Sequence, residues 1–384
     1  RSDHGGGPEH IFQVIGANLP GIEHHIACPD QGVYWERYRE RIGADRLCSL
    51  PHRRLSLRSL WRLRRFARKA DIHIIHSHGT SGGVYGRLIG STLGLPVVHS
   101  FHGVPVTRSL KHGFYHLAER ALSRATRCGV AVSAGEADIV HRRWRQYRGK
   151  LVVVPNGIDL DSEPSRWAPW PSANDEIRIV SFTRRNYQKH PELLVEIARV
   201  LRLQGVRFRI DAYGEGMEHP ELTAAAANRG VSEQLHFHPP TDTPSRALAG
   251  AHIYLSTSRW EGMPLAVLEA WRAGLVVVAS DVVGNRDLVR CGSTGRLFPD
   301  GNGRAAARLI RDLATDTLTA NSLRHHADRL ACLGHGRNLM TIRLGWLYQH
   351  VAENANDATG TEIPRANPAE LPACTISARL RAAS

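Results

Sequence analysis

Residues 251–274 constrain the fold of this chain more than any other stretch, because three kinds of local structure follow one another within them. The apolar run 251–255 is typical of a buried strand in a parallel sheet. A glycine-containing turn over 258–264 follows, and the apolar periodicity of 265–273 predicts a helix. A buried strand, a turn and a helix in this order predict one unit of a doubly wound α/β domain.

The start of this predicted helix is suited to bind an anion. Pro264 fits the first helical turn, where a missing N–H group costs nothing. The amides of Leu265 and Ala266 have no partner within the helix and point outward with the positive end of the helix dipole. Glu261 in the turn and Glu269 one turn beyond Leu265 supply carboxylates for sugar hydroxyls. The alternative is an ordinary strand–turn–helix whose glutamates are only solvated.

Glu261 and Glu269 stand in a frame that resembles the E-x7-E signature of retaining family-4 glycosyltransferases. The flanking Ser258 and the run 276–280 also resemble that family. The resemblance implies a GT-B fold over about residues 4–350, in which two doubly wound parallel-sheet domains face each other across a cleft. It also implies sugar transfer from a nucleotide-sugar to an acceptor hydroxyl, with retention at the anomeric carbon. Glu261 would then contact the donor sugar, and Glu269 the nucleotide ribose.

A second group of candidate binding residues follows the strand predicted over 177–182. Arg184 and Lys189 resemble the family's R-x4-K pattern, and a guanidinium and an ammonium group can neutralise a diphosphate from two directions. A solvated basic turn is the alternative. Gly214 and Gly216 form a G-x-G after the next strand and resemble the family's loop near the diphosphate. Because cations and helix amides already meet the leaving-group charge, we predict neither a metal nor a cofactor.

The first half of the chain contributes a glycine loop and a set of histidines. Gly6 and Gly7 open a predicted helix, and glycines there let a ligand approach the backbone closely. This loop resembles the family's N-terminal glycine loop. We expect a strand before it, so a sequence that starts at Arg1 is expected to be trimmed. The resemblance implies that His102 lines the cleft near the transferred sugar, with His78 as a weaker candidate.

Two patterns suggest a metal ion and are interpreted otherwise. His76 and His78 project to one face of a predicted strand, which invites a zinc interpretation. No cysteine or carboxylate stands at ligand spacing, so we predict no metal there. Asp159 and Asp161 form a D-x-D, which holds a divalent metal in other glycosyltransferases. This pair opens a segment containing Pro and Trp, and we interpret it as a linker.

The predicted site has two groups of residues and no metal ligands. The candidate catalytic residues are Glu261, His102, Arg184 and Lys189. The candidate substrate-binding residues are Gly6, Gly7, Gly214, Gly216, Met263, Pro264, Leu265 and Glu269. An oxocarbenium-like transition state with a departing diphosphate needs its leaving-group charge stabilised, which these cations and amides can do. The resemblance implies that a departing phosphate oxygen takes the acceptor proton, so that no dedicated enzyme base is needed.

The composition indicates a polyanionic partner. The formal net charge is +14 over 384 residues, which suits nucleic acid, an acidic membrane surface or phosphorylated ligands. A GC-rich genome, which favours arginine over lysine, is the competing explanation. The six cysteines are scattered without a C-x-x-C pair, as expected of reduced cytosolic thiols. No apolar run approaches the roughly 20 residues of a membrane span.

The most basic region, 37–68, contains a predicted amphipathic helix that packs its leucine face on the sheet. Trp61 and Phe66 lie among its charges as aromatic anchors. The cationic side chains of this acid-free stretch are Arg53, Arg54, Arg58, Arg62, Arg64, Arg65, Arg68 and Lys69. Such a helix can lie on anionic lipid, and a merely solvated basic face is the alternative. We therefore expect a cytoplasmic protein, peripheral on the inner face of the cell membrane.

The alternation of strands and helices predicts the domain limits. An N-terminal acceptor-binding domain is expected over 1–158, a linker over 159–176, and a C-terminal nucleotide-sugar-binding domain over 177–335. A helix over 336–352 is expected to cross back to the first domain. The tail 353–384 is rich in Ala, Pro, Asn and Thr and is expected to be disordered.

Residues 284–289, together with the stretch from Trp260, look closest to bacterial polysaccharide-assembly members. The expected reaction is transfer to a lipid-linked saccharide in exopolysaccharide, O-antigen or capsule assembly. We favour a UDP-hexose or UDP-N-acetylhexosamine donor, followed by GDP-mannose. One alternative is a non-catalytic nucleotide-sugar-binding protein. The other is a basic nucleic-acid-binding protein, but the chain has neither aromatic-interleaved basic strands nor a recognised module, so no nucleic acid is expected.

Overall fold

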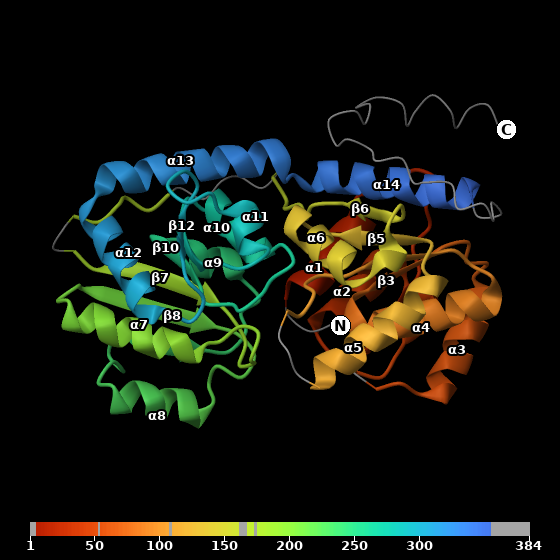
Figure 1. Ribbon diagram of the computed structural model, residues 1–384, viewed down its shortest axis with the longest axis horizontal. Coiled ribbons are helices and arrows are strands. Elements are labelled where there is room, and N and C mark those ends of the chain that lie inside the picture. The colour runs from red at the N-terminus through yellow and green to blue at the C-terminus, as the bar shows by residue number, and fades with distance from the viewer. Residues whose placement is uncertain (1–4, 53, 107–109, 161–166, 173–174, 355–384) are drawn as a thin grey trace.

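Two parallel sheets, one in each half of the chain, organise the computed structural model (Figure 1). It describes residues 5–52, 54–106, 110–160, 167–172 and 175–354. Every named strand pairs in parallel with its neighbours. Helices connect the strands and cover the sheets, so the predicted α/β class with doubly wound sheets is confirmed.

The first half is built on a four-stranded sheet in the order β3-β4-β5-β6, with a separate parallel pair β1-β2. Its strands are β1 (Ile26–Cys28), β2 (Leu47–Ser49), β3 (Ile75–His78), β4 (Val97–Ser100), β5 (Cys128–Ala131) and β6 (Leu151–Val153). Its helices are α1 (Gly6–Gly16), α2 (Val33–Ile42), α3 (Leu57–Lys69), α4 (Gly79–Leu93), α5 (Leu110–Leu122) and α6 (Ala134–Arg143). Short 3₁₀ turns are η1 (Ala44–Arg46), η2 (Ser123–Ala125) and η3 (Arg145–Tyr147).

The second half has a six-stranded sheet in the order β12-β11-β10-β7-β8-β9. Its strands are β7 (Ile177–Phe182), β8 (Phe208–Tyr213), β9 (Leu235–His238), β10 (Ile253–Ser256), β11 (Val276–Ser280) and β12 (Arg296–Phe298). Its helices are α7 (Glu192–Leu203), α8 (Pro220–Asn228), α9 (Pro244–Leu248), α10 (Leu265–Arg272), α11 (Asn285–Leu288), α12 (Gly303–Thr315) and α13 (Thr317–Gly334). Every residue of β10 and β11 is buried, as expected of central strands covered on both faces.

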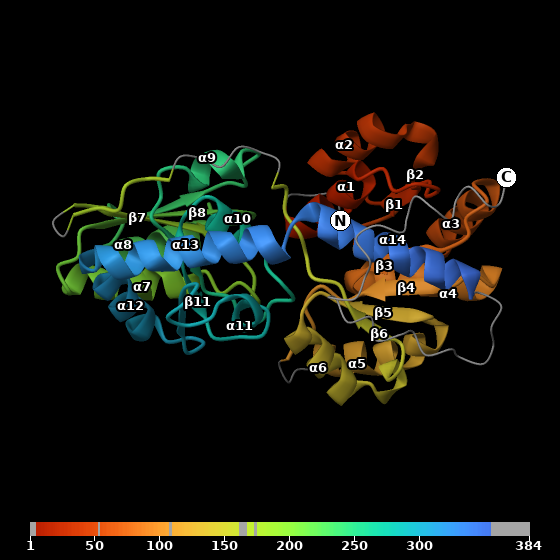
Figure 2. The ribbon, with the colours of Figure 1, turned by 90° about the horizontal axis from the view of Figure 1, so that it is seen from above.

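The last described helix, α14 (Arg337–Glu353), lies on the first half of the chain. Figures 1 and 2 show α13 along the second domain and α14 continuing along the first. Met340, Leu344 and Leu347 of α14 pack with Val98 and Val130 of the first-domain sheet in one buried cluster. This apolar contact ties the C-terminal part of the chain to the N-terminal sheet. Residues 355–384, within the expected disordered tail, lie outside the described residues.

Two side chains of the basic helix α3, Leu57 and Phe66, pack differently from the expectation. Leu63 and Ala67 are buried against the first domain, but Leu57 is 84% exposed and Trp61 is 63% exposed. The predicted packing of Leu57 is therefore wrong, because it shares the outer side of the helix with Trp61, one turn further on. Phe66, which we expected to anchor on lipid, is half-buried beside His25. No helix in the described part of the chain is long and apolar enough to cross a bilayer.

Candidate active site

Glu261 lies in the turn between β10 and α10 and is held from two directions. Its Oε1 is 2.5 Å from Nζ of Lys189 and accepts a hydrogen bond from Oγ of Ser258 at 2.6 Å. The Glu261 residue is only 8% exposed, so this ion pair is largely shielded from water. In the sequence, Ser258 is only a residue that flanks the E-x7-E frame. The structure shows that its hydroxyl positions the carboxylate.

The backbone around Glu261 is packed too closely for side chains. A Cβ atom on Gly262 would lie 2.8 Å from the amide nitrogen of Gly103, in the loop after β4. Gly284 has φ of +88°, and a Cβ atom on it would lie 2.7 Å from the carbonyl carbon of Glu261. Glycine is required where backbones meet at this distance. The loops after β4, β10 and β11 therefore converge at one point between the two domains.

Half-buried and buried polar groups connect the two domains around this point. Asp287 of α11 accepts hydrogen bonds from Oγ of Ser133 at 2.9 Å and from the amide of Gly135 at 2.8 Å. Asn156 donates its side-chain N–H to the carbonyl of Met263 at 2.8 Å, directly before α10. Sequence reasoning missed Asp287 and Asn156, because their partners lie in the other half of the chain.

Glu136 of α6 supports the loop that carries His102. Its carboxylate accepts hydrogen bonds from the amides of Gly103 at 2.5 Å and Val132 at 2.8 Å. Burial raises the pKa of Glu136 to about 7, although these N–H donors favour its charged form. Sequence reasoning also missed this residue, which fixes the backbone of the loop beside Gly262.

Arg184 and Lys189 lie on the loop that follows β7, and Gly214 and Gly216 on the adjacent loop that follows β8. A Cβ atom on Gly214, where φ is +149°, would come within 1.6 Å of the carbonyl oxygen of Thr183. Only glycine allows this approach. The two loops therefore run in contact at the carboxyl ends of neighbouring strands, where doubly wound sheets bind ligands. The pair between Lys189 and Glu261 joins them to the turn before α10.

Helix α10 begins at Leu265, where the apolar periodicity of 265–273 predicts it. Pro264 is the capping residue with an extended ψ of 116°, and the helix starts at Leu265. The expectation that Pro264 occupies the first helical turn is therefore wrong, because a proline in this conformation introduces the turn without joining it. The start of α1 lies over α10, since a Cβ atom on Gly6 would be 3.3 Å from Cδ1 of Leu265. A Cβ atom on Gly7 would meet nothing within 4 Å.

Glu269 is half-buried on α10 and lies near a second carboxylate. Burial, followed by the charge of Glu9 on α1, raises the pKa of Glu269 to about 7. Glu9 itself accepts hydrogen bonds from the hydroxyl of Tyr34 and from Nε2 of Gln13. The Glu269 carboxyl group is therefore poised to donate or accept hydrogen bonds near neutral pH.

His102 has an uncommon left-handed backbone, with φ of 57°, directly before Gly103. Its Nε2 is 2.9 Å from Nδ1 of His78, at the end of β3. Burial lowers the pKa of His102 to about 4 and that of His78 well below its usual value, so both rings are neutral at pH 7. His76 and His78 share one side of β3, as predicted, with ring centroids 4.1 Å apart.

A third histidine, His10 of α1, reaches the same place from a different element. Its ring centroid lies 5.2 Å from that of His102 and 5.9 Å from that of His78. Spacing within the strand that holds His76 and His78 does not reveal it, because His10 belongs to a different element. Its position one turn after the glycine loop is the signal that could have found it.

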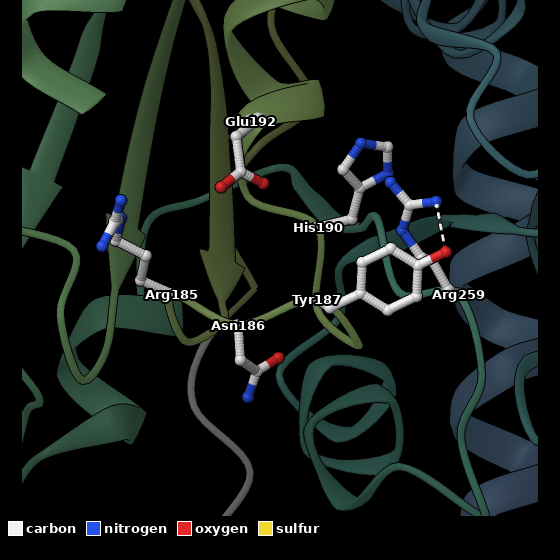
Figure 3. Close-up of a pocket in the computed structure, with 6 residues that line it drawn as sticks. All are labelled: Arg185, Asn186, Tyr187, His190, Glu192 and Arg259. Carbon is white, nitrogen blue, oxygen red and sulfur yellow. Dashed lines mark hydrogen bonds between the residues drawn. The ribbon is translucent and has the colours of Figure 1, made fainter. Parts of the chain in front are cut away.

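An open depression of about 420 Å³ adjoins the loop after β7 (Figure 3). The residues that line it are Arg185, Asn186, Tyr187, His190, Glu192 and Arg259. The guanidinium of Arg259 lies 4.2 Å from the ring centroid of Tyr187. None of the predicted site residues lines this depression. The Asp159 carboxylate, one half of the D-x-D, lies 3.1 Å from Nη1 of Arg337, and Asp161 lies outside the described residues.

Two family models together match most of the chain. Residues 17–162 match the model described as Glycosyltransferase Family 4. Residues 166–329 match the model described as Glycosyl transferases group 1. The chain belongs to the family-4 glycosyltransferases. It is therefore an enzyme that transfers sugar, and the resemblance found in the sequence is confirmed.

Curated relatives of the enzyme include transferases with different acceptors. It is 27% identical over 331 residues to a D-inositol 3-phosphate glycosyltransferase of Streptomyces avermitilis, covering 79% of this chain and 70% of the relative. It is 26% identical over 253 residues to an Escherichia coli galactosyltransferase named as UDP-Gal:alpha-D-GlcNAc-diphosphoundecaprenol alpha-1,3-galactosyltransferase. That match covers 61% of this chain and 64% of the relative.

Solved structures share the fold of the enzyme. The Anabaena protein Alr3699/HepE, solved in complex with UDP and glucose, superposes with a TM-score of 0.76 at 15% identity. The superposition covers 91% of this chain and 97% of that one. A glycosyltransferase from Rickettsia africae gives a TM-score of 0.73 at 17% identity, covering 91% and 96%. These similarities confirm the predicted GT-B fold.

Proposed function

We propose that the enzyme transfers a sugar from a nucleotide-sugar to a hydroxyl of a lipid-linked saccharide, with retention at the anomeric carbon. The expected donor is a UDP-hexose or UDP-N-acetylhexosamine, with GDP-mannose next. The observation that carries the proposal is the shielded Lys189–Glu261 pair, which stands between the loop after β7 and the start of α10. Cations, helix amides and carboxylates then surround one space at the carboxyl ends of the strands.

The donor diphosphate binds to the second domain in this proposal. Arg184 and Lys189 approach it as cations, and the first amides of α10, near Leu265, approach it with the positive end of the helix dipole. Gly214 and Gly216 let the loop after β8 come close to the same phosphates. These groups stabilise the charge that develops as the bond between the anomeric carbon and the phosphate oxygen breaks. No metal ion is needed for this step.

The sugar and ribose are oriented by carboxylates and by a neutral imidazole. Glu261, held by Ser258 and Lys189, contacts the donor sugar, and Glu269 contacts the ribose hydroxyls. His102 reaches the sugar from the first domain. The acceptor oxygen forms the new bond to the anomeric carbon on the face that the diphosphate leaves. Its proton passes to the departing phosphate oxygen, so the step is balanced without an enzyme base.

Two features support a membrane-bound acceptor. The name of the Escherichia coli relative specifies a sugar on diphosphoundecaprenol, a lipid carrier, as acceptor, whereas that of the Streptomyces relative specifies an inositol phosphate without lipid. In this chain, α3 presents Arg58, Arg65, Arg68 and the 63%-exposed Trp61 to solvent. A helix with exposed arginines and an exposed indole suits an anionic membrane surface. We therefore propose that the enzyme works at the cytoplasmic face of the membrane, in polysaccharide assembly.

The donor assignment is tested with a panel of nucleotide-sugars and thermal unfolding. A donor at 100 times its Kd stabilises the native state by about 2.7 kcal/mol, so the matching nucleotide-sugar raises the melting temperature by several degrees. UDP-sugars should give the largest increase. Product analysis follows with that donor and a diphosphate-lipid saccharide. Stabilisation without transfer would indicate the non-catalytic binding protein, and stabilisation by oligonucleotides alone would contradict the proposal.

The membrane assignment is tested by reversing charge on α3. Arg58, Arg65 and Arg68 are changed to Glu, and Arg62 is kept because it bonds the carbonyl of Ser49. Each arginine near an acidic leaflet contributes about 1 kcal/mol, so removing three lowers vesicle affinity at least a hundredfold. The matched control reverses three exposed arginines of α12, Arg304, Arg308 and Arg311. Equal sedimentation of both variants with anionic vesicles would show that α3 is only a scaffold helix.

A further inference from the structure

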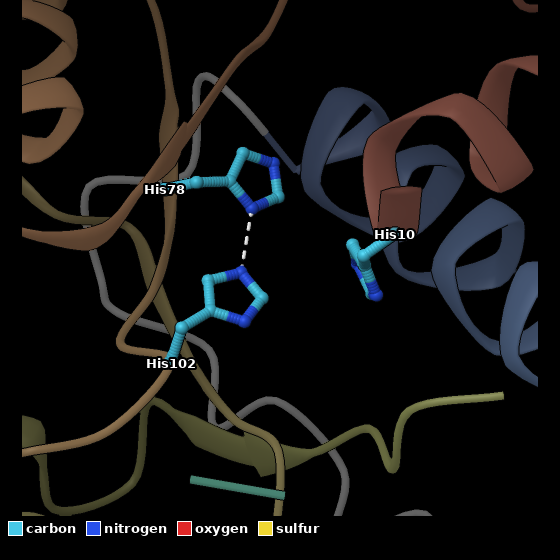
Figure 4. A group of neighbouring side chains, drawn as sticks. All are labelled: His10, His78 and His102. Atoms are coloured by element: carbon cyan, nitrogen blue, oxygen red, sulfur yellow. Dashed lines mark hydrogen bonds between the residues drawn. The ribbon is translucent and has the colours of Figure 1, made fainter. Parts of the chain in front are cut away.

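Three histidines from separate elements converge between α1 and the first-domain sheet (Figure 4). His10 comes from α1, His78 from the end of β3, and His102 from the loop after β4. One nitrogen from each ring lies within 4.8 Å of the other two. Within the part of the chain that the structure describes, this is the only group of at least three His, Cys, Asp or Glu side chains with ligand atoms so close.

The hydrogen bonds of the three rings are incomplete. His78 and His102 share one hydrogen bond, between Nδ1 and Nε2 at 2.9 Å. His10 is only 3% exposed, and its Nδ1 has no hydrogen-bond partner among the described residues. A buried polar atom without a partner is uncommon and calls for a ligand or a water molecule. Figure 4 shows the ring of His10 on the opposite side of the shared space from the bonded pair.

We propose that His10, His78 and His102 form a binding site for a divalent transition-metal ion of the zinc type. Three imidazoles suit zinc, copper or nickel and do not suit magnesium or calcium, which prefer oxygen ligands. Zinc with bonds of about 2.0–2.1 Å in a tetrahedron holds its ligand nitrogens about 3.4 Å apart. The present separations of 2.9 Å and up to 4.8 Å bracket that value, so small ring rotations suffice.

The surroundings suit a site with one open position. His78 and His102 are only half-buried, so solvent or a small ligand can reach the fourth coordination position. The side chain of Asn156 lies beside His10, and its Oδ1 is buried without a hydrogen-bond partner among the described residues. This oxygen can accept a hydrogen bond from the ring nitrogen of His10 that carries the proton and does not bind the ion. Acceptors of this kind orient the histidines of metal sites.

The ion would compete with the donor sugar. His102 contacts that sugar in the proposed function, and an ion bound to His102 removes this contact. Zinc is then an inhibitor, and transfer itself needs no metal. This consequence rests on the proposed function, whereas ion binding does not. It is tested by measuring donor affinity with and without zinc, and an unchanged affinity would overturn the competition.

The site is tested with protein that carries no polyhistidine tag. Cobalt(II) is titrated as a spectroscopic probe, and zinc affinity is measured against a chromophoric chelator. The unaltered enzyme should bind one equivalent and develop the visible absorption of tetrahedral cobalt. His10→Gln and His78→Gln should each weaken binding at least tenfold. The matched control is His73→Gln, since the side chain of His73 is 82% exposed and stands outside the cluster.

X-ray absorption of the zinc-loaded unaltered enzyme supplies a measurement that does not depend on how the variants fold. It should show three imidazole ligands. Fewer than three, or the same affinity in the His10 and His78 variants as in the His73 control, would overturn the metal site. A failure of every nucleotide-sugar to bind would overturn the proposed function and would leave the zinc measurement unaffected.

Discussion

Replacement of Lys189 by Met tests the assignment of the shielded ion pair to catalysis. Methionine keeps most of the side-chain length and removes only the charge. In the proposed mechanism, the ammonium group stabilises the departing diphosphate. Losing one such group costs about 2–4 kcal/mol of transition-state stabilisation, or about 30- to 1,000-fold in rate. The loss should appear in kcat more than in KM, because the charge develops mainly in the transition state.

The same substitution leaves Glu261 without its cation. The side chains of Lys189 and Glu261 are 18% and 9% exposed, and Ser258 still donates to the carboxylate. Breaking a fully buried pair costs about 3–5 kcal/mol, so this partly exposed and partly satisfied pair should cost about 1–2 kcal/mol of unfolding free energy. Adding Glu261→Gln removes the orphaned charge. The double variant should therefore regain stability without regaining activity.

The assay is the initial rate of nucleoside diphosphate release with the stabilising donor and an acceptor, alongside thermal unfolding. The matched control is Arg185→Met on the same loop, because Arg185 pairs with the exposed Glu221 and not with Glu261. The control should keep the rate of the unaltered enzyme within about threefold, which is less than 1 kcal/mol. A Lys189→Met rate within the same threefold, or a double variant that recovers the rate, would refute the role given to Lys189.

Three further predictions concern metal, pH and backbone. Transfer should survive EDTA, since Arg184, Lys189 and the α10 amides meet the diphosphate; full loss restored by manganese would contradict this. Burial raises the folded-state pKa of Glu269 from 4.5 to about 7, so the folded state favours the neutral carboxyl group. The contribution of this group to the free energy of unfolding is fully present below pH 4.5 and is lost as the pH rises through 7. Glu269→Gln should therefore raise the melting temperature of the free enzyme more at pH 8 than at pH 5, and an equal change at both would contradict the burial. Gly214→Ala should lower the free energy of unfolding, measured by chemical denaturation, by about 3 kcal/mol or more, because its Cβ atom would lie 1.6 Å from a carbonyl oxygen. Gly205→Ala, with φ of +71° in open space, should lower it by only about 1–2 kcal/mol. Similar values for the two variants would refute the close loop contact.

The sequence predicted well the features that depend on local pattern. The apolar run 251–255 predicted β10, and the periodicity after Pro264 predicted α10. Both predictions succeed because burial and helical periodicity can be recognised from the order of neighbouring residues. Arg184 and Lys189 were singled out by their spacing, and both lie on the loop after β7; their contact with a diphosphate stays a prediction. Only the place of Pro264 differs, since its propensity for a first turn does not decide on which side of the helix boundary it lies.

The contacts between the domains could not be predicted in this way. Asp287 and Ser133 are 154 positions apart, and Asn156 and Met263 are 107 apart. No periodicity links such residues, and they meet only because both sheets present their loops to the same space. His10 escaped notice for the same reason, since its partners His78 and His102 lie on other elements.

The anomeric configuration of the product tests the central claim most directly. The purified enzyme is given the nucleotide-sugar that stabilises it most and a diphosphate-lipid saccharide, and the new linkage is examined by NMR. With an α-configured donor, the account predicts one new α-glycosidic bond per nucleoside diphosphate released, and loss of the product in Lys189→Met. A β-linkage, or diphosphate release without any sugar transferred, would contradict it.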